Sequence, residues 1–334
     1  MGLREVAAEA GVCLMTVSLA LRDSPKISAA TRQRVRAVAD RLGYRPDAEV
    51  ARLMGKLRAS RMVRGSIAIA LIDLQPQGGE AEHHYTKRLR QGAVARAGEL
   101  GFSVDSFRLR DYGGSAEKMM RVIRSRGIVG GVLLPPDRPV TLPKTIWGGF
   151  SVVSATSAVV MPRFHCVIPN QLYNTMALIE QMHARGYQKV GAIITESLEK
   201  RTAHCYSLAM IWHGHGERIL LLEDGATDEA HERRIAAWLR DHAVDAIFAQ
   251  NAEVVARAVQ SGADRIGLVS LSTIAPGPIA YQDELPDYVG ESAVSLLAGM
   301  MHNSETDVPT HPRVTTIDGV LREAASLRPG SPGA

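Results

Sequence analysis

Residues 6–21 read VAAEAGVCLMTVSLAL, and the spacing of their apolar side chains predicts two short helices. Val6 and Ala10 lie four residues apart on one face of the first helix, and Val17 and Leu21 do the same on the second. The glycine between the two pairs lacks a Cβ, which allows the backbone to turn there. Two helices joined in this way predict a helix-turn-helix, whose second helix can lie in the DNA major groove.

A third helix is expected after this pair. Ser28 can cap its first turn, and Val35, Val38 and Leu42 recur behind it at helical spacing. Gly43 follows in the position that a left-handed residue takes after a helix. Five side chains of the second helix lie largely outside the packed face and should point outward: Leu14, Met15, Thr16, Ser18 and Leu19.

Size and composition describe a globular chain with more than one domain. At 334 residues it is too long for one ordinary core, which predicts two or three domains. It contains no run of about 18 apolar residues and no signal-peptide pattern, so we expect neither a membrane span nor export, and a cytoplasmic location at the nucleoid. Cys13, Cys166 and Cys205 have no metal-ligand spacing, so we interpret them as reduced thiols and expect no metal or cofactor.

Positive charge is concentrated in the N-terminal fifth of the chain. Residues 1–64 hold 13 Lys and Arg against 6 Asp and Glu, whereas the remaining residues hold 26 against 29. A small basic module on a larger body that is not basic favours contact with phosphates. A basic segment can also be a solvated surface, so the charge is supporting evidence only.

A short segment connects this module to the rest of the chain. Pro46 breaks the preceding helix, and residues 48–54 can form about two turns of another. A helix of this length is marginal alone in water because nucleation is costly. We therefore expect it to become helical only when a partner is present.

Strands and helices alternate from Ser66 onward. The first series is strand 67–72, helix 86–100, strand 103–108, helix 116–125 and strand 130–134. The second is helix 172–184, strands 189–194 and 217–222, helix 229–241, strand 246–250, helix 253–261 and strand 266–271. This alternation predicts two doubly wound parallel sheets. Two such lobes leave a cleft at the carboxyl ends of their strands, where ligands of open α/β sheets bind.

With both parts placed, the chain resembles the lactose-repressor (LacI) family of bacterial transcription regulators over essentially its whole length. The residues that carry the resemblance are Val6-Ala7, Ala10-Gly11-Val12, Thr16-Val17-Ser18, Ser24-Pro25-Lys26-Ile27-Ser28, Thr31-Arg32 and Leu42-Gly43-Tyr44-Arg45-Pro46. The resemblance implies an all-α helix-turn-helix head and an α/β, two-lobed body like the periplasmic binding proteins. It also implies a sequence-specific transcriptional regulator, most often a repressor, that binds a palindromic operator in double-stranded DNA as a homodimer. A small-molecule effector, often a sugar, would bind between the lobes.

The expected division of the chain follows from this resemblance. It is a head at 1–45, a hinge at 46–60, a first lobe at 61–165 and 285–303, a second lobe at 166–284 and 304–325, and a disordered tail at 326–334. Residues 285–301 should form a helix that returns to the first lobe, and 314–320 a last strand of the second lobe.

The resemblance assigns DNA contacts by position. Leu14, Met15 and Leu19 should face base edges, Thr16, Ser18, Thr31 and Tyr44 should contact phosphates or orient the module, and Arg22 joins this set. Leu53 stands where the family inserts a leucine into the minor groove, which kinks the duplex. Cys13 replaces the usual serine at the start of the recognition helix and loses a cap worth about 1 kcal/mol. Because Leu19 replaces a common arginine, readout should rely on thymine methyl groups and DNA shape.

The same comparison assigns the effector site. Asn170, Arg201, Asn251 and Ser272 match effector positions in the second lobe, and Asp73 and Tyr85 match positions in the first. Gln282 is a further expected cleft residue, although its distance to Gly290 departs from the usual spacing. Asn170 and Ser272 replace aspartates that grip sugar hydroxyls in many members, which weakens the expectation of a sugar. The Arg201 guanidinium can hold a hydroxyl pair or a carboxylate.

Other interpretations remain open at this point. The head could be a three-helix bundle without a DNA role, and Leu53 could be a surface or dimer-contact leucine. The polar residues at strand ends could simply cap helices. His83-His84 and His213-x-His215 fit surface or loop histidines better than zinc ligands. A solute-binding protein is disfavoured by the head, and an enzyme would need an acid–base pair or nucleophile that these motifs do not supply, so we expect none.

Overall fold

The computed structural model describes residues 3–21, 27–43, 67–75, 83–259 and 266–327. The linker expected at 46–60, including Leu53, and the contact residues Arg22 and Tyr44 lie outside these ranges. So does the tail from residue 328 onward. No described helix is long and apolar enough to cross a membrane.

The head is a bundle of three helices around one small core. They are α1 (Leu3–Ala10), α2 (Leu14–Leu21) and α3 (Ala29–Arg41). Gly11 has a φ of +65° between α1 and α2, and the Thr31 amide donates to the Ser28 hydroxyl oxygen at the start of α3. The buried apolar side chains come from all three helices: Val6, Ala7, Ala10, Val17, Ala20, Val35, Val38 and Ala39. The predicted helix-turn-helix with a third helix is confirmed.

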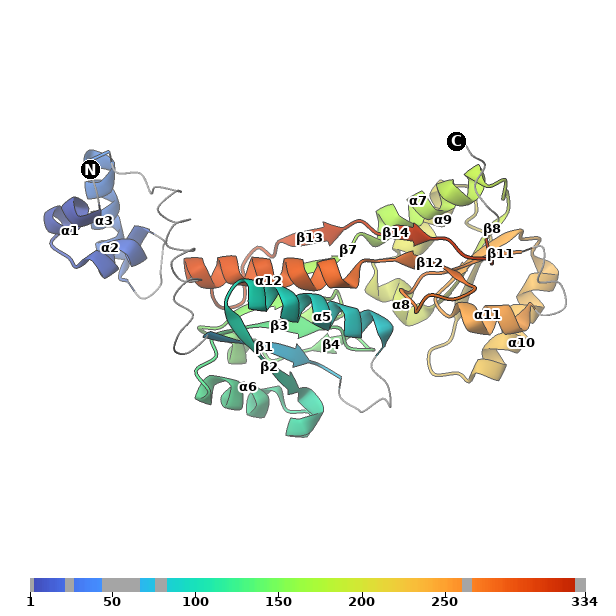
Figure 1. Cartoon of the computed structure of the whole chain (residues 1–334), viewed down its shortest axis with the longest axis horizontal. Helices are drawn as coiled ribbons and strands as arrows, with labels where there is room; N and C mark the ends of the chain where they lie inside the picture. Colours follow the sequence, from blue (N-terminus) through green and yellow to red (C-terminus); the bar gives the residue numbers. More distant parts are fainter. Residues whose placement is uncertain (1–2, 22–26, 44–66, 76–82, 260–265, 328–334) are drawn as a thin grey trace.

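The first lobe is built on a parallel sheet of order β13-β7-β5-β3-β1-β2. Its strands are β1 (Ile67–Asp73), β2 (Phe102–Arg108), β3 (Gly130–Leu134), β5 (Ser151–Ser154), β7 (His165–Pro169) and β13 (Val314–Ile317). Helices α5 (His84–Glu99) and α12 (Pro286–Asn303) cover one face, and α6 (Ala116–Ser125) covers the other (Figure 1). Because side chains of a strand alternate between faces, Ile69 and Leu71 join the α5–α12 core while Ala70 and Ile72 join the α6 core.

Smaller elements complete this lobe. They are the 3-10 turns η1 (Leu109–Tyr112) and η2 (Lys144–Trp147) and the two-stranded sheet of β4 (Val140–Thr141) and β6 (Val159–Met161). The buried Trp147 of η2 packs edge-on against Phe164 with ring centroids 5.0 Å apart. The α6 face of the sheet is therefore closed by aromatic side chains as well as by the helix.

The second lobe repeats this plan with the sheet order β14-β12-β11-β10-β8-β9. Its strands are β8 (Val190–Thr195), β9 (Ile219–Leu222), β10 (Ala246–Ala249), β11 (Gly267–Ser270), β12 (Ala280–Asp283) and β14 (Val320–Arg322). Its helices are α7 (Gln171–Ala184), α8 (Glu196–Arg201), α9 (Cys205–Trp212), α10 (Asp228–Asp241) and α11 (Ala252–Ala258). Helices α7 and α9 pack on one face and α10 and α11 on the other, while β14 runs antiparallel to β12.

The sheets correct two expectations from the sequence. The single strand expected at 314–320 is two strands, because β13 pairs with β7 in the first sheet and β14 pairs with β12 in the second. Residues 166–169 and 314–317 therefore belong to the first lobe, not to the second as expected. Backbone pairing decides this placement, since Val314 lies opposite Cys166. The chain consequently crosses between the lobes after β7, after β12 and after β13.

The start of the expected disordered tail is also ordered. The Ser326 hydroxyl donates to the Leu268 carbonyl at 2.6 Å and accepts from the Ala280 amide at 2.8 Å. Leu327 is buried in the core beneath α7 and α9. These contacts fix residues 326–327 against the second sheet.

Candidate DNA-binding head and interlobe ligand site

Helix α2 presents one row of side chains outside the head core. Val17 and Ala20 are buried, whereas Leu14 is 44% exposed and Thr16 and Leu19 are half-buried. This agrees with the expectation that Leu14, Thr16 and Leu19 lie off the packed face. The structure does not describe the side chains of Met15 and Ser18, which lie on the same helix.

Short local contacts fix the first turns of α2 and α3. Cys13 precedes α2, and its Sγ lies 3.2 Å from Thr16 Oγ1 in the first turn of that helix. Thr31, in the first turn of α3, is half-buried and its hydroxyl lies 2.8 Å from that of Ser28. At the other end of α3, Arg41 forms a 2.7 Å ion pair with Glu9 of α1. The ion pair thus joins α3 to α1, while the shared apolar core holds all three helices together.

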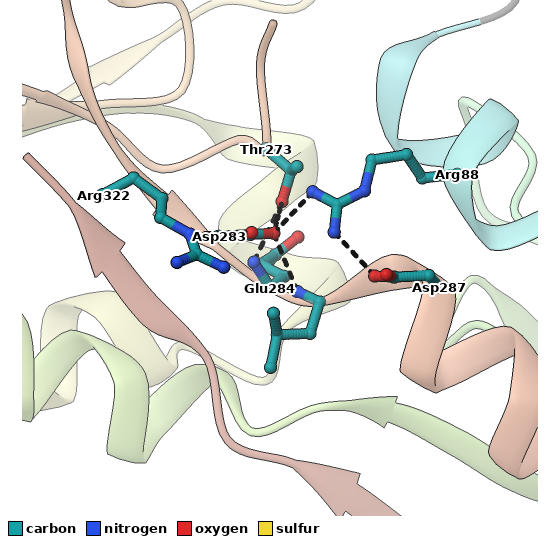
Figure 2. A network of polar contacts seen from close by, with 7 residues as sticks. Arg88, Thr273, Asp283, Glu284, Asp287 and Arg322 are labelled. Carbon is teal, nitrogen blue, oxygen red and sulfur yellow. Dashed lines mark hydrogen bonds and ion pairs between the residues drawn. The ribbon is translucent and has the colours of Figure 1, made fainter. Parts of the chain in front are cut away.

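A buried carboxylate marks the junction between the two lobes. Asp283 is the last residue of β12, and its side chain is only 2% exposed. Arg88 of the first-lobe helix α5 donates to it at 2.9 Å and, through its other terminal nitrogen, to Asp287 at 2.6 Å. Arg322 of β14 approaches Asp283 from the opposite side at 3.2 Å, as Figure 2 shows. Arg88 therefore joins a first-lobe helix directly to a second-lobe strand end.

Backbone contacts hold the same corner. Asp283 also accepts a hydrogen bond from the Leu285 amide at 3.1 Å, and Leu285 has a left-handed φ of +50°. The Thr273 hydroxyl oxygen accepts from the Glu284 amide at 2.9 Å (Figure 2). Positive φ is uncommon for a leucine, so these bonds define a sharp, specified turn where the chain passes from β12 to α12.

Glu284, which follows Asp283, belongs to a second group of polar side chains. Its Oε1 accepts from Gln171 Nε2 at 2.5 Å, and Gln171 in turn accepts from the Tyr206 hydroxyl at 2.9 Å. Burial raises the pKa of the Glu284 carboxyl to about 7, against the lowering effects of the Gln171 hydrogen bond and of Arg201. Near neutral pH this carboxyl is therefore poised between its two protonation states.

Two of the expected effector residues lie beside Glu284. Burial is the main cause that raises the pKa of Tyr85, and Glu284 raises it further while Arg201 lowers it. The same three causes, with burial first, act on Tyr206. The structure thus brings Tyr85 of the first lobe and Arg201 of the second into one electrostatic group around Glu284, whereas the sequence had placed them only by resemblance.

The other expected effector residues are engaged with the protein itself. Asn170 donates to Asp318 at 2.8 Å, Asn251 accepts from the Val254 amide at 3.4 Å as the cap of α11, and the Ser272 hydroxyl donates to the Gln250 carbonyl at 3.4 Å. Asp73 accepts from the Gln75 amide at 2.9 Å and lies 3.9 Å from Arg90. Gln282 is 5% exposed and lies opposite Leu321 in the sheet. These contacts are the helix-capping and loop roles that the sequence also allowed.

A separate small hollow of about 150 Å³ lies in the second lobe at the carboxyl ends of β8, β9 and β10. Its polar lining comes from Thr195, Asp228, His231, Gln250 and Asn251. Of the expected effector residues, Asn251 is the one that lines it.

The junction contains functional candidates that the sequence did not indicate: Arg88, Gln171, Tyr206, Asp283 and Glu284. Their signal was weak because β12, which ends in the acidic pair Asp283-Glu284, was not predicted as a strand. Two adjacent carboxylates before Pro286, a good first residue for a helix, were the feature that could have drawn attention to this turn.

The thiols and histidines of the described residues do not form a metal site. No group of three or more His, Cys, Asp or Glu side chains there is placed to hold a metal ion. Burial raises the pKa of Cys205 to about 11, which keeps it a thiol. His183 and His215 instead contact each other, with their Nε2 atoms 2.9 Å apart.

Comparison with known proteins agrees with this geometry. Residues 2–47 match the family described as bacterial regulatory proteins, lacI family, and no curated protein matches the chain. Among similar solved structures, a transcriptional regulator CelR–cellobiose complex is 17% identical, with a TM-score of 0.57 over 98% of this chain and 99% of that one. A lac repressor dimer bound to operator and the anti-inducer ONPF is 15% identical, with a TM-score of 0.59 over 98% of each chain.

A third similar structure is a LacI-family transcriptional regulator from Silicibacter pomeroyi, which is 19% identical with a TM-score of 0.52 over 96% of this chain and 98% of that one. At these identities the structural likeness establishes only the fold. The match over residues 2–47 establishes the family of the head. Residues 2–47 thus belong to the lacI family of bacterial regulatory proteins, and the chain as a whole has the head-and-two-lobes fold of solved regulators of that family.

Proposed function

We propose that this protein is a sequence-specific DNA-binding transcriptional regulator, a repressor, whose operator affinity is set by a small polar effector bound between the two lobes. The observation that carries this proposal is the combination, in one chain, of a lacI-family head with a two-lobed body of the matching fold. DNA recognition and ligand recognition are then properties of different parts of the chain, and the segment between them transmits one to the other.

The DNA-contacting surface of this proposal is the outward row of α2 with the residues around it. The set is Leu14, Met15, Thr16, Ser18, Leu19, Arg22, Thr31, Tyr44 and Leu53. The exposed Leu14 supports an apolar contact with base edges such as thymine methyl groups. The positive charge of residues 1–64 supports phosphate contacts. A homodimer would place two such heads on the halves of a palindromic site.

Control by the effector rests on the lobe junction. Arg88, Asp283 and Asp287 link the lobes where the chain crosses between them, so a ligand that changes how the lobes close also changes this link. The proposed ligand contacts are Tyr85 and Arg201, and the further candidates assigned by resemblance are Asp73, Asn170, Asn251, Ser272 and Gln282. A coupling of about 1–3 kcal/mol between effector and operator is the usual scale for such regulators.

Selection of random DNA duplexes by the purified full-length chain tests the DNA-binding half. We expect a palindrome to be enriched, with an affinity that falls steeply as salt rises. Leu14→Ala should weaken binding to that site by about tenfold, because one base contact is worth roughly 1–3 kcal/mol. Gln33→Ala, at an exposed position of α3, is the matched control and should bind as the parent does.

Two results would contradict this proposal. One is that no palindrome is enriched at any salt concentration. The other is that a chain lacking residues 1–45 and carrying Leu53→Ala retains the selected duplex as well as the parent does.

We propose a cytoplasmic location, because a regulator of this kind acts on the chromosome.

We also propose that the lobe junction binds a ligand without turning it over. Asp283 is engaged by two guanidinium groups, and burial raises the pKa of both Cys166 and Cys205, so neither thiol is an activated nucleophile. Incubation of each bound ligand with the protein, followed by mass analysis, should return the ligand unchanged. Conversion of ligand to product would contradict this part of the proposal.

A further inference from the structure

Three polar groups at the lobe junction have bonding capacity that the described residues do not use. Arg201 donates no hydrogen bond and forms no ion pair with any of them, and the Tyr85 hydroxyl from the opposite lobe makes no hydrogen bond with them either. Glu284 gives one carboxylate oxygen to Gln171, and its second oxygen accepts no hydrogen bond from that part of the chain. Junction groups with spare donors and acceptors are what a ligand needs for orientation.

These groups form one cluster with two opposite poles. Arg201 is the last residue of α8, and Tyr206 near the start of the next helix, α9, is linked to Glu284 through Gln171. In agreement with this placement, Arg201 lowers the pKa of Glu284 and of Tyr85, although it is not ion-paired with Glu284. Glu284 is 8% exposed and follows directly on the buried Asp283. The half-buried guanidinium, which has no ion-pair partner among the described residues, is therefore a positive pole, and the carboxylate oxygen is a negative one. The two groups are held by different elements on the second-lobe side of the junction.

The neutral polar side chains expected at the effector site each make one contact within the protein. Asn170 is bonded to Asp318, Asn251 caps α11, and the Ser272 hydroxyl is bonded to Gln250. None of the three carries a charge, so none of them can neutralise Arg201 or an ionised Glu284. A neutral polyol would also bring no opposite charge to these two groups, whereas a ligand with matching charges would pair with both.

We propose that the effector of this protein is a small zwitterion of the amino-acid type, with its carboxylate on Arg201 and its ammonium group on Glu284. This inference rests on the proposed function, since it names the ligand class of the same junction. Tyr85 then supplies a hydroxyl from the first lobe, so that closing the lobes completes the site. Gln171 and Tyr206 hold the Glu284 carboxylate in position from behind.

Proton exchange separates this ligand class from two others. Glu284 has a pKa of about 7, so protonated and ionised sites coexist near neutral pH. An ammonium group favours the ionised carboxylate, and binding should therefore release protons. A ligand with a carboxylate alone would bring a second negative charge near Glu284 and cause proton uptake. A neutral sugar would cause little exchange.

The test uses the full-length protein. Thermal-shift measurements with each standard amino acid, with ribose and cellobiose, and with gluconate identify the ligand class. Calorimetric titration of the best ligand in two pH 7 buffers of different ionisation enthalpy then gives the sign of proton exchange. We expect an amino acid to raise the melting temperature and to release protons on binding.

Two substitutions locate the poles. Glu284→Gln keeps the shape of the side chain and its bond to Gln171, and it should weaken the amino acid about 10- to 100-fold and abolish proton release. Arg201→Gln should weaken it to a similar extent. Glu217→Gln, on a carboxylate that is exposed and paired with Arg218, is the matched control and should leave both quantities unchanged. Circular dichroism shows whether each variant is folded.

Several outcomes would overturn the proposal. They are the absence of a shift with any amino acid, a shift with a sugar or gluconate alone, proton uptake on binding, and an amino-acid affinity that Glu284→Gln does not change. These outcomes differ from failure of the proposed function, which is read from duplex selection without any ligand. A protein that selects a palindrome and responds to a neutral sugar contradicts this inference alone.

Discussion

Glu284 is a buried acid whose ionisation opposes folding. In the folded chain its pKa is about 7 instead of its ordinary 4.5, chiefly because of burial. Below pH 4.5 the carboxyl is neutral in both the folded and the unfolded chain, and the free energy of unfolding is not reduced by this group. As the pH rises through 7 the free energy of unfolding falls, because the folded protein must then hold a buried, ionised carboxylate. The largest effect is on the order of 3 kcal/mol.

This sign gives a prediction for Glu284→Gln. The amide does not titrate, so the variant should equal the parent in free energy of unfolding near pH 4.5 and exceed it increasingly up to pH 8. Urea unfolding of both chains across this range measures the difference. A difference that is constant with pH, or that favours the parent at pH 8, would contradict the assignment of a raised pKa to this residue.

Arg88 and Arg322 share Asp283 but do not hold it equally. The Arg88 side chain is 21% exposed and the Arg322 side chain is 50% exposed, while Asp283 is almost fully buried. Removal of the more buried partner leaves a buried carboxylate with weaker compensation. Arg88→Met should therefore lower the free energy of unfolding by about 3 kcal/mol, and the control Arg322→Met by about 1 kcal/mol. If urea unfolding shows the same loss of free energy for both variants, the bond from Arg88 to Asp283 stabilises the fold no more than the bond from Arg322 does.

At the scale of elements, α5 and α12 of the first lobe cross in close backbone contact. A Cβ on Gly92 would lie 2.1 Å from the Asp287 carbonyl oxygen, and one on Gly290 would lie 2.1 Å from the Leu89 carbonyl oxygen. Both obstacles are backbone atoms, which cannot turn aside as a side chain could. The two glycines thus allow the helices to touch and bring Arg88 of α5 within reach of Asp287 of α12.

Gly92→Ala should therefore separate the two helices. We expect it to lower the free energy of unfolding by about 3 kcal/mol, because overpacking of a close contact is relieved only by moving a whole helix. Gly98→Ala is the matched control on the same helix, where a Cβ meets nothing within 4 Å, and it should raise stability by up to about 1 kcal/mol. Thermal unfolding of both variants measures the pair. Similar melting temperatures would mean that the crossing is looser than described.

The sequence predicted elements well where apolar periodicity was long and local. Residues 116–125 and 130–134 form α6 and β3 at the expected bounds. It predicted strands poorly where their bounds and their sheet depend on the strands with which they pair. Residues 314–320 look like one strand, yet the chain turns at Asp318-Gly319 and enters a second sheet, a choice made by β7 and β12 far away in sequence. No local pattern contains that information.

The same distinction applies to the candidate ligand site. Arg201 and Tyr85 could be placed by resemblance, and the structure brings them near each other. Glu284 could not, because it follows β12, a strand of four residues whose sequence Ala-Tyr-Gln-Asp has no distinctive pattern. Its importance comes from burial beside Gln171 and Arg201, which depends on the whole junction being assembled.

At the scale of the whole molecule, three crossing segments share one crowded point between the lobes. The Gly319 amide donates to Asn174 at 2.7 Å, and Asn170 of the first crossing is bonded to Asp318 of the third. A Cβ on Gly319 would lie 2.7 Å from the Asp283 carbonyl oxygen and 2.7 Å from Gln282 Nε2, both of the second crossing. A change in the angle between the lobes must therefore disturb these contacts.

Gly319→Ala should therefore hold the lobes apart. The new methyl group pushes against the backbone of Asp283, and the third crossing can accommodate it only by moving away from the second. We expect a loss of about 1–3 kcal/mol in the free energy of unfolding and a larger radius of gyration in small-angle scattering. The control is Gly277→Ala in the second lobe, where the nearest atom lies 3.9 Å from the new Cβ, and it should change neither quantity. If Gly319→Ala is as compact and as stable as the parent, the close contact between the second and third crossings does not control the angle between the lobes.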